Sequence, residues 1–105
     1  MKRDKRISNL VDQITSGFNP QKIILFGSHA YGKPDDDSDV DLLVIMKTRK
    51  NTLDATADVR QAIDHAFPID IIVRTPEQIR KRLKWEDSFI KEIMEKGKVL
   101  YEAPG

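Results

Sequence analysis

The chain of 105 residues contains no cysteine. That absence excludes disulfide scaffolds, thiolate metal sites, iron–sulfur clusters and cysteine nucleophiles, and it fits a reducing cytosol. The sequence also lacks any apolar run close to the roughly 18 residues of a membrane span, and residues 1–6 lead into no signal-peptide core. We therefore expect a cytoplasmic protein with no membrane association.

What the chain does have is the composition of a soluble globular protein, with 39% hydrophobic and 33% charged residues. Area scaling predicts that a chain of this length buries about two-thirds of its surface on folding, which is enough for a single core. The sequence shows no internal repeat, linker or low-complexity tract. We expect one domain over residues 1–105.

The net charge of +1 hides an uneven distribution. Residues 33–41 carry a net charge of −4, because they contain one base, Lys33, and five acids: Asp35, Asp36, Asp37, Asp39 and Asp41. The rest of the chain carries +5. An acidic segment on a mildly basic body favours a cation site over a nucleic-acid surface, which would be far more basic.

Hydrophobic spacing predicts helices alternating with strands. Helices are expected at residues 7–18, at 53–66, from the capping box of residues 75–78 onward, and at 89–96, where Gly97 closes the last one. Strands are expected at 23–26, 40–46, 69–73 and 98–101, and residues 27–38 form a structured loop with one helical turn. This order predicts an α/β domain.

Two expectations concern which side chains enter the core. In the second helix, the apolar face is predicted to consist of Leu53, Ala57, Ala62, Ile63 and Ala66. Trp85 and Phe89 are interpreted as a helix face packed on the core rather than as an exposed partner patch. The basic cluster Arg80, Lys81, Arg82 and Lys84 is expected to form a solvated helix face, with contact to an acidic partner or RNA as the alternative.

Two familiar motifs fail in the segment from Gly27 onward. Residues 27–33 have the glycine, four residues, glycine-lysine spacing of a phosphate loop, but Pro34 replaces the hydroxyl residue that such a loop needs. The alternating acids from Asp35 resemble the start of an EF-hand, but Val40 stands where glycine is required, and Met46 where glutamate is.

The remaining pattern is Gly27-Ser28, a loop, and Asp39-Val40-Asp41 at the start of a strand. Residues two apart on a strand share a face, so Asp39 and Asp41 point the same way. If the strand containing Asp70 lies alongside, three carboxylates converge and fit two divalent cations. The alternative is a solvated strand start, with Asp70 capping a helix end or pairing with an arginine.

These residues resemble a known family. The strings Leu25-Phe26-Gly27-Ser28 and Ser38-Asp39-Val40-Asp41-Leu42-Leu43-Val44, with a later strand bearing Asp70, look like the minimal nucleotidyltransferases of the DNA polymerase beta superfamily. The ending Gly97-Lys98-Val99-Leu100-Tyr101-Glu102 is also typical, so the resemblance covers nearly the whole chain. It implies the nucleotidyltransferase fold, a small mixed β-sheet packed with helices.

The resemblance also implies an activity. A nucleoside monophosphate would pass to an acceptor hydroxyl with release of pyrophosphate; AMP from ATP is expected, with another nucleoside triphosphate as the alternative substrate. Asp39, Asp41 and Asp70 would be the catalytic and metal-binding residues for two Mg²⁺ ions, for which Mn²⁺ could substitute. Gly27, Ser28 and Lys33 would bind the triphosphate, although Lys33 could equally just screen the acids.

Two classes of function remain open. The resemblance implies an active enzyme that serves as the antitoxin half of a toxin–antitoxin pair and modifies a small all-helical HEPN-type partner. The alternative is a catalytically weak or inactive module that binds a nucleotide or a partner. Tyr31 bears on this choice because many family members carry arginine there, and a tyrosine cannot neutralise phosphate charge.

Overall fold

A computed structural model of the chain describes residues 5–32, 39–63 and 68–104. The elements in these ranges are α1 (Lys5–Phe18), β1 (Lys22–Phe26), α2 (Ser28–Tyr31), β2 (Val40–Ile45), α3 (Thr52–Ala62), β3 (Ile69–Arg74), α4 (Pro76–Lys84), α5 (Ser88–Lys96) and β4 (Lys98–Glu102). The expected helices and strands are therefore confirmed within the described residues, including the single helical turn after Gly27, while the parts expected at 33–38 and 64–66 lie outside them. None of the helices so described is both long and apolar enough to cross a membrane.

The four strands form one mixed sheet in the order β3-β2-β1-β4. β1 pairs antiparallel with both β2 and β4, while β2 and β3 run parallel. The parallel pair is possible because α3 forms the crossover between them. The predicted α/β fold with a small mixed sheet is confirmed.

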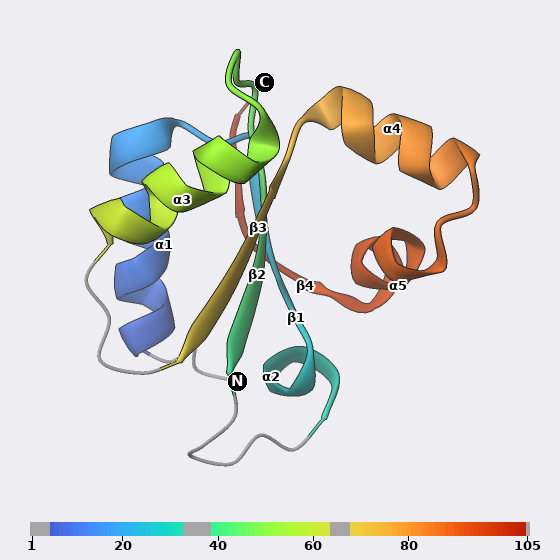
Figure 1. Ribbon diagram of the computed structural model, residues 1–105. Coiled ribbons are helices and arrows are strands. Elements are labelled where there is room, and N and C mark those ends of the chain that lie inside the picture. The colour runs from blue at the N-terminus through green and yellow to red at the C-terminus, as the bar shows by residue number, and fades with distance from the viewer. Residues whose placement is uncertain (1–4, 33–38, 64–67, 105) are drawn as a thin grey trace.

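Side chains alternate between the two faces of the sheet, and each face has its own apolar cluster. One cluster joins Ile23, Leu42 and Val44 to helices α1 and α3. The other joins Ile24, Leu43 and Ile45 to helices α4 and α5. Figure 1 shows the resulting three layers, with α1 and α3 on one side of the sheet and α4 and α5 on the other.

The predicted core face of the second helix is wrong. Leu53 is 81% exposed, and Ala57 and Ala62 are exposed too, whereas Ala55, Val59 and Ile63 enter the core. The helix is oriented by a bond that the apolar spacing does not reveal, because the Thr56 hydroxyl accepts from the Val73 amide of β3 at 3.3 Å. Ile63 was placed correctly, and Ala66 lies outside the described residues.

The corner between α4 and α5 also differs from expectation. Trp85 is 72% exposed on the turn after α4, so its assignment to the core is wrong. Phe89 is half-exposed, but its ring meets that of Phe26 edge-on, with 5.7 Å between ring centroids. The Thr75 capping box and the Asp87 N-cap fix where the two helices begin, which leaves Trp85 between them.

Candidate active site

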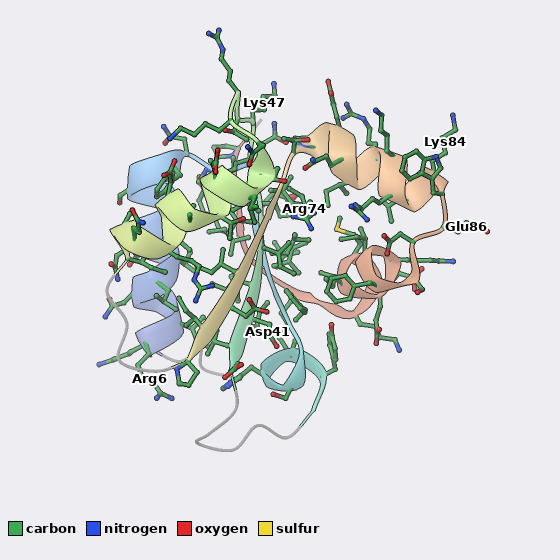
Figure 2. The ribbon with its side chains drawn as sticks, viewed as in Figure 1. Arg6, Asp41, Lys47, Arg74, Lys84 and Glu86 are labelled. Carbon is green, nitrogen blue, oxygen red and sulfur yellow. The ribbon has the colours of Figure 1, made fainter. Side chains whose placement is uncertain are left out.

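The sheet register brings two of the predicted carboxylates together. Asp41 on β2 is the direct partner of Asp70 on β3 and, on its other side, of Phe26 on β1. The three residues therefore form one row across neighbouring strands, on the face that α4 and α5 cover. The prediction that the strand bearing Asp70 lies beside the strand bearing Asp41 is confirmed. Figure 2 shows Asp41 at the end of the sheet beside α2.

Gly27 joins this row to helix α2. It has φ +75°, a conformation that side-chain-bearing residues rarely adopt. A Cβ atom added here would overlap the Asp41 carboxylate, so the missing side chain also makes room for that acid. The Gly27 carbonyl accepts from the amides of Ala30 and Tyr31 at 3.0 and 3.1 Å, and these bonds fold the turn of α2. Ser28, the first residue of α2, is thereby held next to the row.

Electrostatic effects link the third acid to this cross-strand pair. The pKa of Asp41 is raised above its usual value, first by partial burial and then by the negative charges of Asp70 and Asp39. The His29 side chain on α2 acts electrostatically in the opposite direction and lowers the Asp41 pKa. Asp39, which precedes β2, therefore belongs to the same cluster as the cross-strand pair.

The cluster has the right chemistry for a divalent cation, because carboxylate oxygens are the ligands that Mg²⁺ prefers. Among the described residues, however, no three acidic or histidine side chains stand in positions that could hold one ion as they are. Asp39 and Asp70 are both exposed at the rim, where their side chains have room to turn. The donor set fits a cation, and the ligand geometry stays a prediction.

Sequence reasoning reached most of this site but not all of it. Lys33 lies outside the described residues, so its predicted contact with phosphate stays a prediction. The influence of His29 on Asp41 was not predicted as such, although its position next to Ser28 could have signalled it. The fit between Gly27 and Asp41 was also missed, since it depends on two residues 14 positions apart in the chain.

The nucleotidyltransferase domain family matches residues 5–100. This chain belongs to that family. The nucleotidyltransferase domain thus covers both the Gly27-Ser28 turn and the three acids, and nucleotidyl transfer is the activity of the class. The resemblance found in the sequence is confirmed.

Two proteins of Methanocaldococcus jannaschii are similar to this nucleotidyltransferase domain, and both have the printed name "putative protein adenylyltransferase". One is 31% identical over 105 residues, which cover 96% of this chain and 100% of the relative. The other is 33% identical over 72 residues, or 69% of this chain and 70% of the relative.

A crystal structure from Sulfolobus solfataricus, titled as that of a "putative nucleotidyltransferase", has a similar fold. It superposes with a TM-score of 0.65 over 93% of this chain and 78% of that one, at 24% sequence identity. At that identity the likeness supports the fold alone.

Proposed function

We propose that this domain transfers AMP from ATP to a hydroxyl group on another protein. The observation that carries the proposal is the row of Asp41 and Asp70 on paired strands, directly beside the glycine that opens the Gly27-Ser28 turn. The names of the two archaeal relatives, as protein adenylyltransferases, support both the nucleotide and the kind of acceptor.

In the proposed reaction, the acceptor hydroxyl oxygen attacks the α-phosphorus of ATP in line with the bridging oxygen to the β-phosphorus. A phosphorus–oxygen bond forms to the acceptor while the bond to the bridging oxygen breaks, and pyrophosphate leaves. The hydroxyl proton passes to the carboxylate of Asp70, which acts as general base. Positioning and charge neutralisation supply most of the rate in such transfers.

The chain contributes to each part of this reaction. Gly27 lets the backbone approach the triphosphate, and the Ser28 hydroxyl donates a hydrogen bond to it. Asp39, Asp41 and Asp70 would hold Mg²⁺, or Mn²⁺ in its place. When bound, the metal would neutralise negative charge on the triphosphate and the leaving pyrophosphate. Burial raises the Asp41 pKa first, and the neighbouring charges of Asp70 and Asp39 add to it; a cation in this place would relieve that repulsion.

The proposed biological setting is a toxin–antitoxin pair in which this domain is the antitoxin and the acceptor is a small all-helical HEPN-type protein. The resemblance supports this setting. A tyrosine, serine or threonine hydroxyl of that partner would receive the AMP.

The proposal is tested by incubating the domain with Mg²⁺, labelled ATP and the helical protein encoded beside it. We expect label on the partner, and release of one pyrophosphate for each AMP attached. Asp41→Asn should abolish the labelling, while Asp12→Asn, which removes one exposed acid from α1, should leave it unchanged.

Calorimetry with Mn²⁺ and ATP on the same three proteins separates binding from chemistry. If the partner protein binds but receives no label from ATP, GTP, CTP or UTP, the domain is not an enzyme for this partner. That result would favour the binding module. Equal affinity of the wild type and Asp41→Asn for metal and ATP would contradict the site itself.

A further inference from the structure

A second row of side chains crosses the same face of the sheet at its opposite end. Lys22 on β1 is the direct partner of Ile45 on β2 and of Glu102 on β4, and Ile45 is in turn the partner of Arg74 on β3. This row lies four residues along the strands from the row of Asp41 and Asp70, or about 13 Å away. It shares no residue with the candidate active site.

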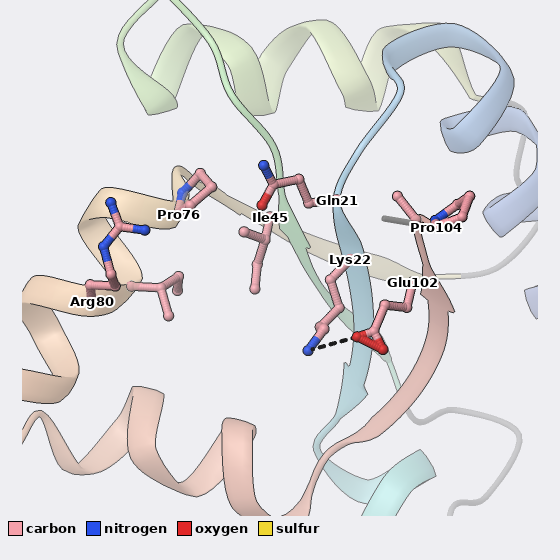
Figure 3. A pocket seen from close by; sticks show the side chains of 9 residues that line it. Gln21, Lys22, Ile45, Pro76, Arg80, Glu102 and Pro104 are labelled. Atoms are coloured by element: carbon pink, nitrogen blue, oxygen red, sulfur yellow. Dashed lines mark ion pairs between the residues drawn. The ribbon is translucent and has the colours of Figure 1, made fainter.

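Helix α4 faces this second row across a groove. The groove consists of two cavities of about 470 and 490 Å³, and both are lined by Gln21, Pro76 and Arg80. Ile45 and Ile79 give the first cavity apolar walls. Figure 3 shows Arg80 on α4 and Lys22 on β1 on opposite sides of it. Both cavities are open to solvent, the first has polar and apolar walls in similar measure, and each volume lies within the range of small-molecule sites.

The basic groups of this groove are incompletely neutralised. Lys22 pairs with Glu102 at 3.4 Å. The side chains of Arg80 and Lys47, the latter lining the second cavity, form no ion pair or hydrogen bond with any residue in the described part of the chain. Glu77 is the one other acid of the lining. The Arg80 side chain therefore borders both cavities without a partner, and Lys47 borders the second, more polar one.

Arg74 adds a partly buried positive charge beneath α4. Burial lowers the pKa of its guanidinium below the usual value, and the charge of Arg82 lowers it further. Asp87 opposes this effect but does not cancel it. An anion bound in this region would be attracted by Arg74 as well as by the side chains that line the groove, whereas Arg82 is already paired with Asp87 at 3.0 Å.

We propose that the groove between α4 and the end of the sheet is a second binding site, which takes a small organic phosphate. The guanidinium of Arg80 would hold the phosphate through paired hydrogen bonds, with Lys47 adding charge from the side. The apolar part of the ligand would lie on Ile45, Pro76 and Ile79. The site is separate from the proposed transferase chemistry and does not depend on it.

The test follows backbone amide signals by NMR while phenyl phosphate is added to the full chain, without metal or nucleotide. We expect saturable shifts at Lys22, Ile79, Arg80 and Ala103, and none at Gly27 or Asp41. Inorganic phosphate, which lacks the apolar part, and phenol, which lacks the charge, should each bind more weakly.

Variants separate this site from a general effect of charge. Arg80→Gln should weaken phenyl phosphate binding about tenfold or more, as expected for loss of charge-assisted hydrogen bonds. Lys47→Gln should weaken it less. Lys84→Gln removes one positive charge from the exposed end of the same helix and should change nothing. Equal weakening by Arg80→Gln and Lys84→Gln, no saturation, or shifts centred on Asp41 would each overturn the proposal.

Discussion

The two ends of one sheet face carry opposite charges. At one end, Asp41 and Asp70 sit side by side on paired strands, and at the other, Arg74 and Lys22 flank Ile45. The acids gather beside the Gly27 turn, whose φ of +75° glycine adopts without a steric penalty. The bases lie under a nine-residue helix, α4, whose start is fixed by a full capping box.

The two ends also differ in how far their charged side chains are neutralised by neighbours. At the acidic end the Asp41 pKa is raised by burial and then by the like charges of Asp70 and Asp39. At the basic end Glu102 pairs with Lys22 and Asp87 pairs with Arg82, yet Arg80 has no partner among the described residues. Crowded charge of one sign is a feature of binding and catalytic sites. The acidic end suits a cation, and the basic end suits an anion.

The largest expected effect is that of Asp70→Asn on nucleotidyl transfer. Loss of the general base should lower the rate by about a hundredfold to ten-thousandfold. Because Asp70 is exposed, the fold and partner binding should be unaffected. The measurement is single-turnover labelling of the partner, with circular dichroism as the control for folding. A rate within threefold of the wild type would remove Asp70 from the mechanism.

Gly27→Ala should have the next largest effect, because it damages the turn that holds the acidic end. The new Cβ would overlap the Asp41 carboxylate, and φ +75° is unfavourable for alanine. We expect a loss of roughly 1–3 kcal/mol in unfolding free energy. Gly17→Ala is the matched control, because a Cβ there meets nothing within 4 Å. That variant should be neutral or slightly stabilising, and equal losses in urea titrations of the two would refute the argument.

Thr75→Ala tests the basic end. The Thr75 hydroxyl accepts from the Gln78 amide at 3.1 Å, and Gln78 in turn accepts from the Thr75 amide at 2.9 Å. Losing this cap should cost about 1 kcal/mol and weaken phenyl phosphate binding, because Thr75 also lines the groove.

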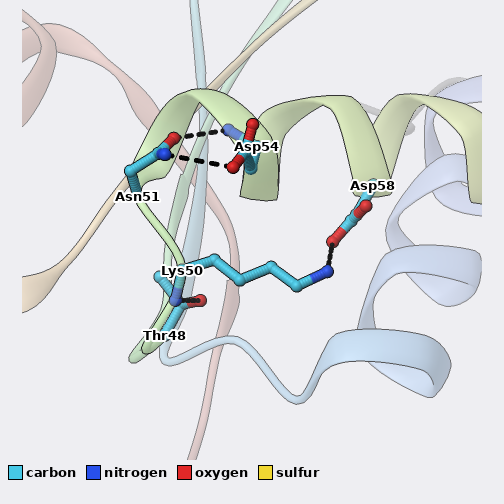
Figure 4. Close-up of polar contacts among 5 residues, drawn as sticks. All are labelled: Thr48, Lys50, Asn51, Asp54 and Asp58. Atoms are coloured by element: carbon cyan, nitrogen blue, oxygen red, sulfur yellow. Dashed lines mark hydrogen bonds and ion pairs between the residues drawn. The ribbon is translucent and has the colours of Figure 1, made fainter.

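Asn51→Ala is the matched control on α3. The Asn51 side chain accepts from the Asp54 amide at 2.8 Å and donates to the Asp54 carboxylate at 3.0 Å, as Figure 4 shows. This variant should lose similar stability, measured by thermal unfolding, and keep phenyl phosphate binding intact. A loss of binding in both variants would mean that global stability, and not the start of α4, controls the groove.

Local signals account for what the sequence could predict. The capping box at Thr75 and the spacing of apolar residues placed the helices and strands, and the Asp39-x-Asp41 spacing with Asp70 on a later strand located the acidic end. These signals are short-range and are read within one element.

What remained hidden depends on register between distant segments. Strand pairing and the packing of α4 on the sheet bring together Lys22, Arg74 and Arg80. No local sequence pattern therefore predicts the basic end. The prediction of which face of α3 is buried was wrong for the same reason, because the Thr56–Val73 hydrogen bond joins residues 17 positions apart.

The smallest expected effects concern stability against pH, and they should have opposite signs in two acids. The Asp41 pKa is raised by burial and by Asp70, so the folded state holds the Asp41 proton more tightly than the unfolded state does. The Asp87 pKa is lowered by hydrogen bonds from the Ile90 amide and from Arg82.

Asp41 therefore destabilises the folded state least at acidic pH, where its carboxyl is protonated. The free energy of unfolding declines as pH rises above the ordinary aspartate pKa of 3.8 and through the raised value. Asp41→Asn should stabilise the metal-free protein at pH 7 by about 0.5 kcal/mol, a value discounted for solvent screening, and the gain should vanish below pH 3.8. Asp87→Asn keeps an N-cap side chain but loses the charge, so it should destabilise at pH 7, and that loss should also vanish as pH falls through the lowered Asp87 pKa. Urea titrations of the three proteins from pH 3 to pH 8 measure both differences. If Asp41→Asn and Asp87→Asn change the free energy of unfolding at pH 7 in the same direction, the net charge of the protein, and not the local surroundings of each acid, determines both effects.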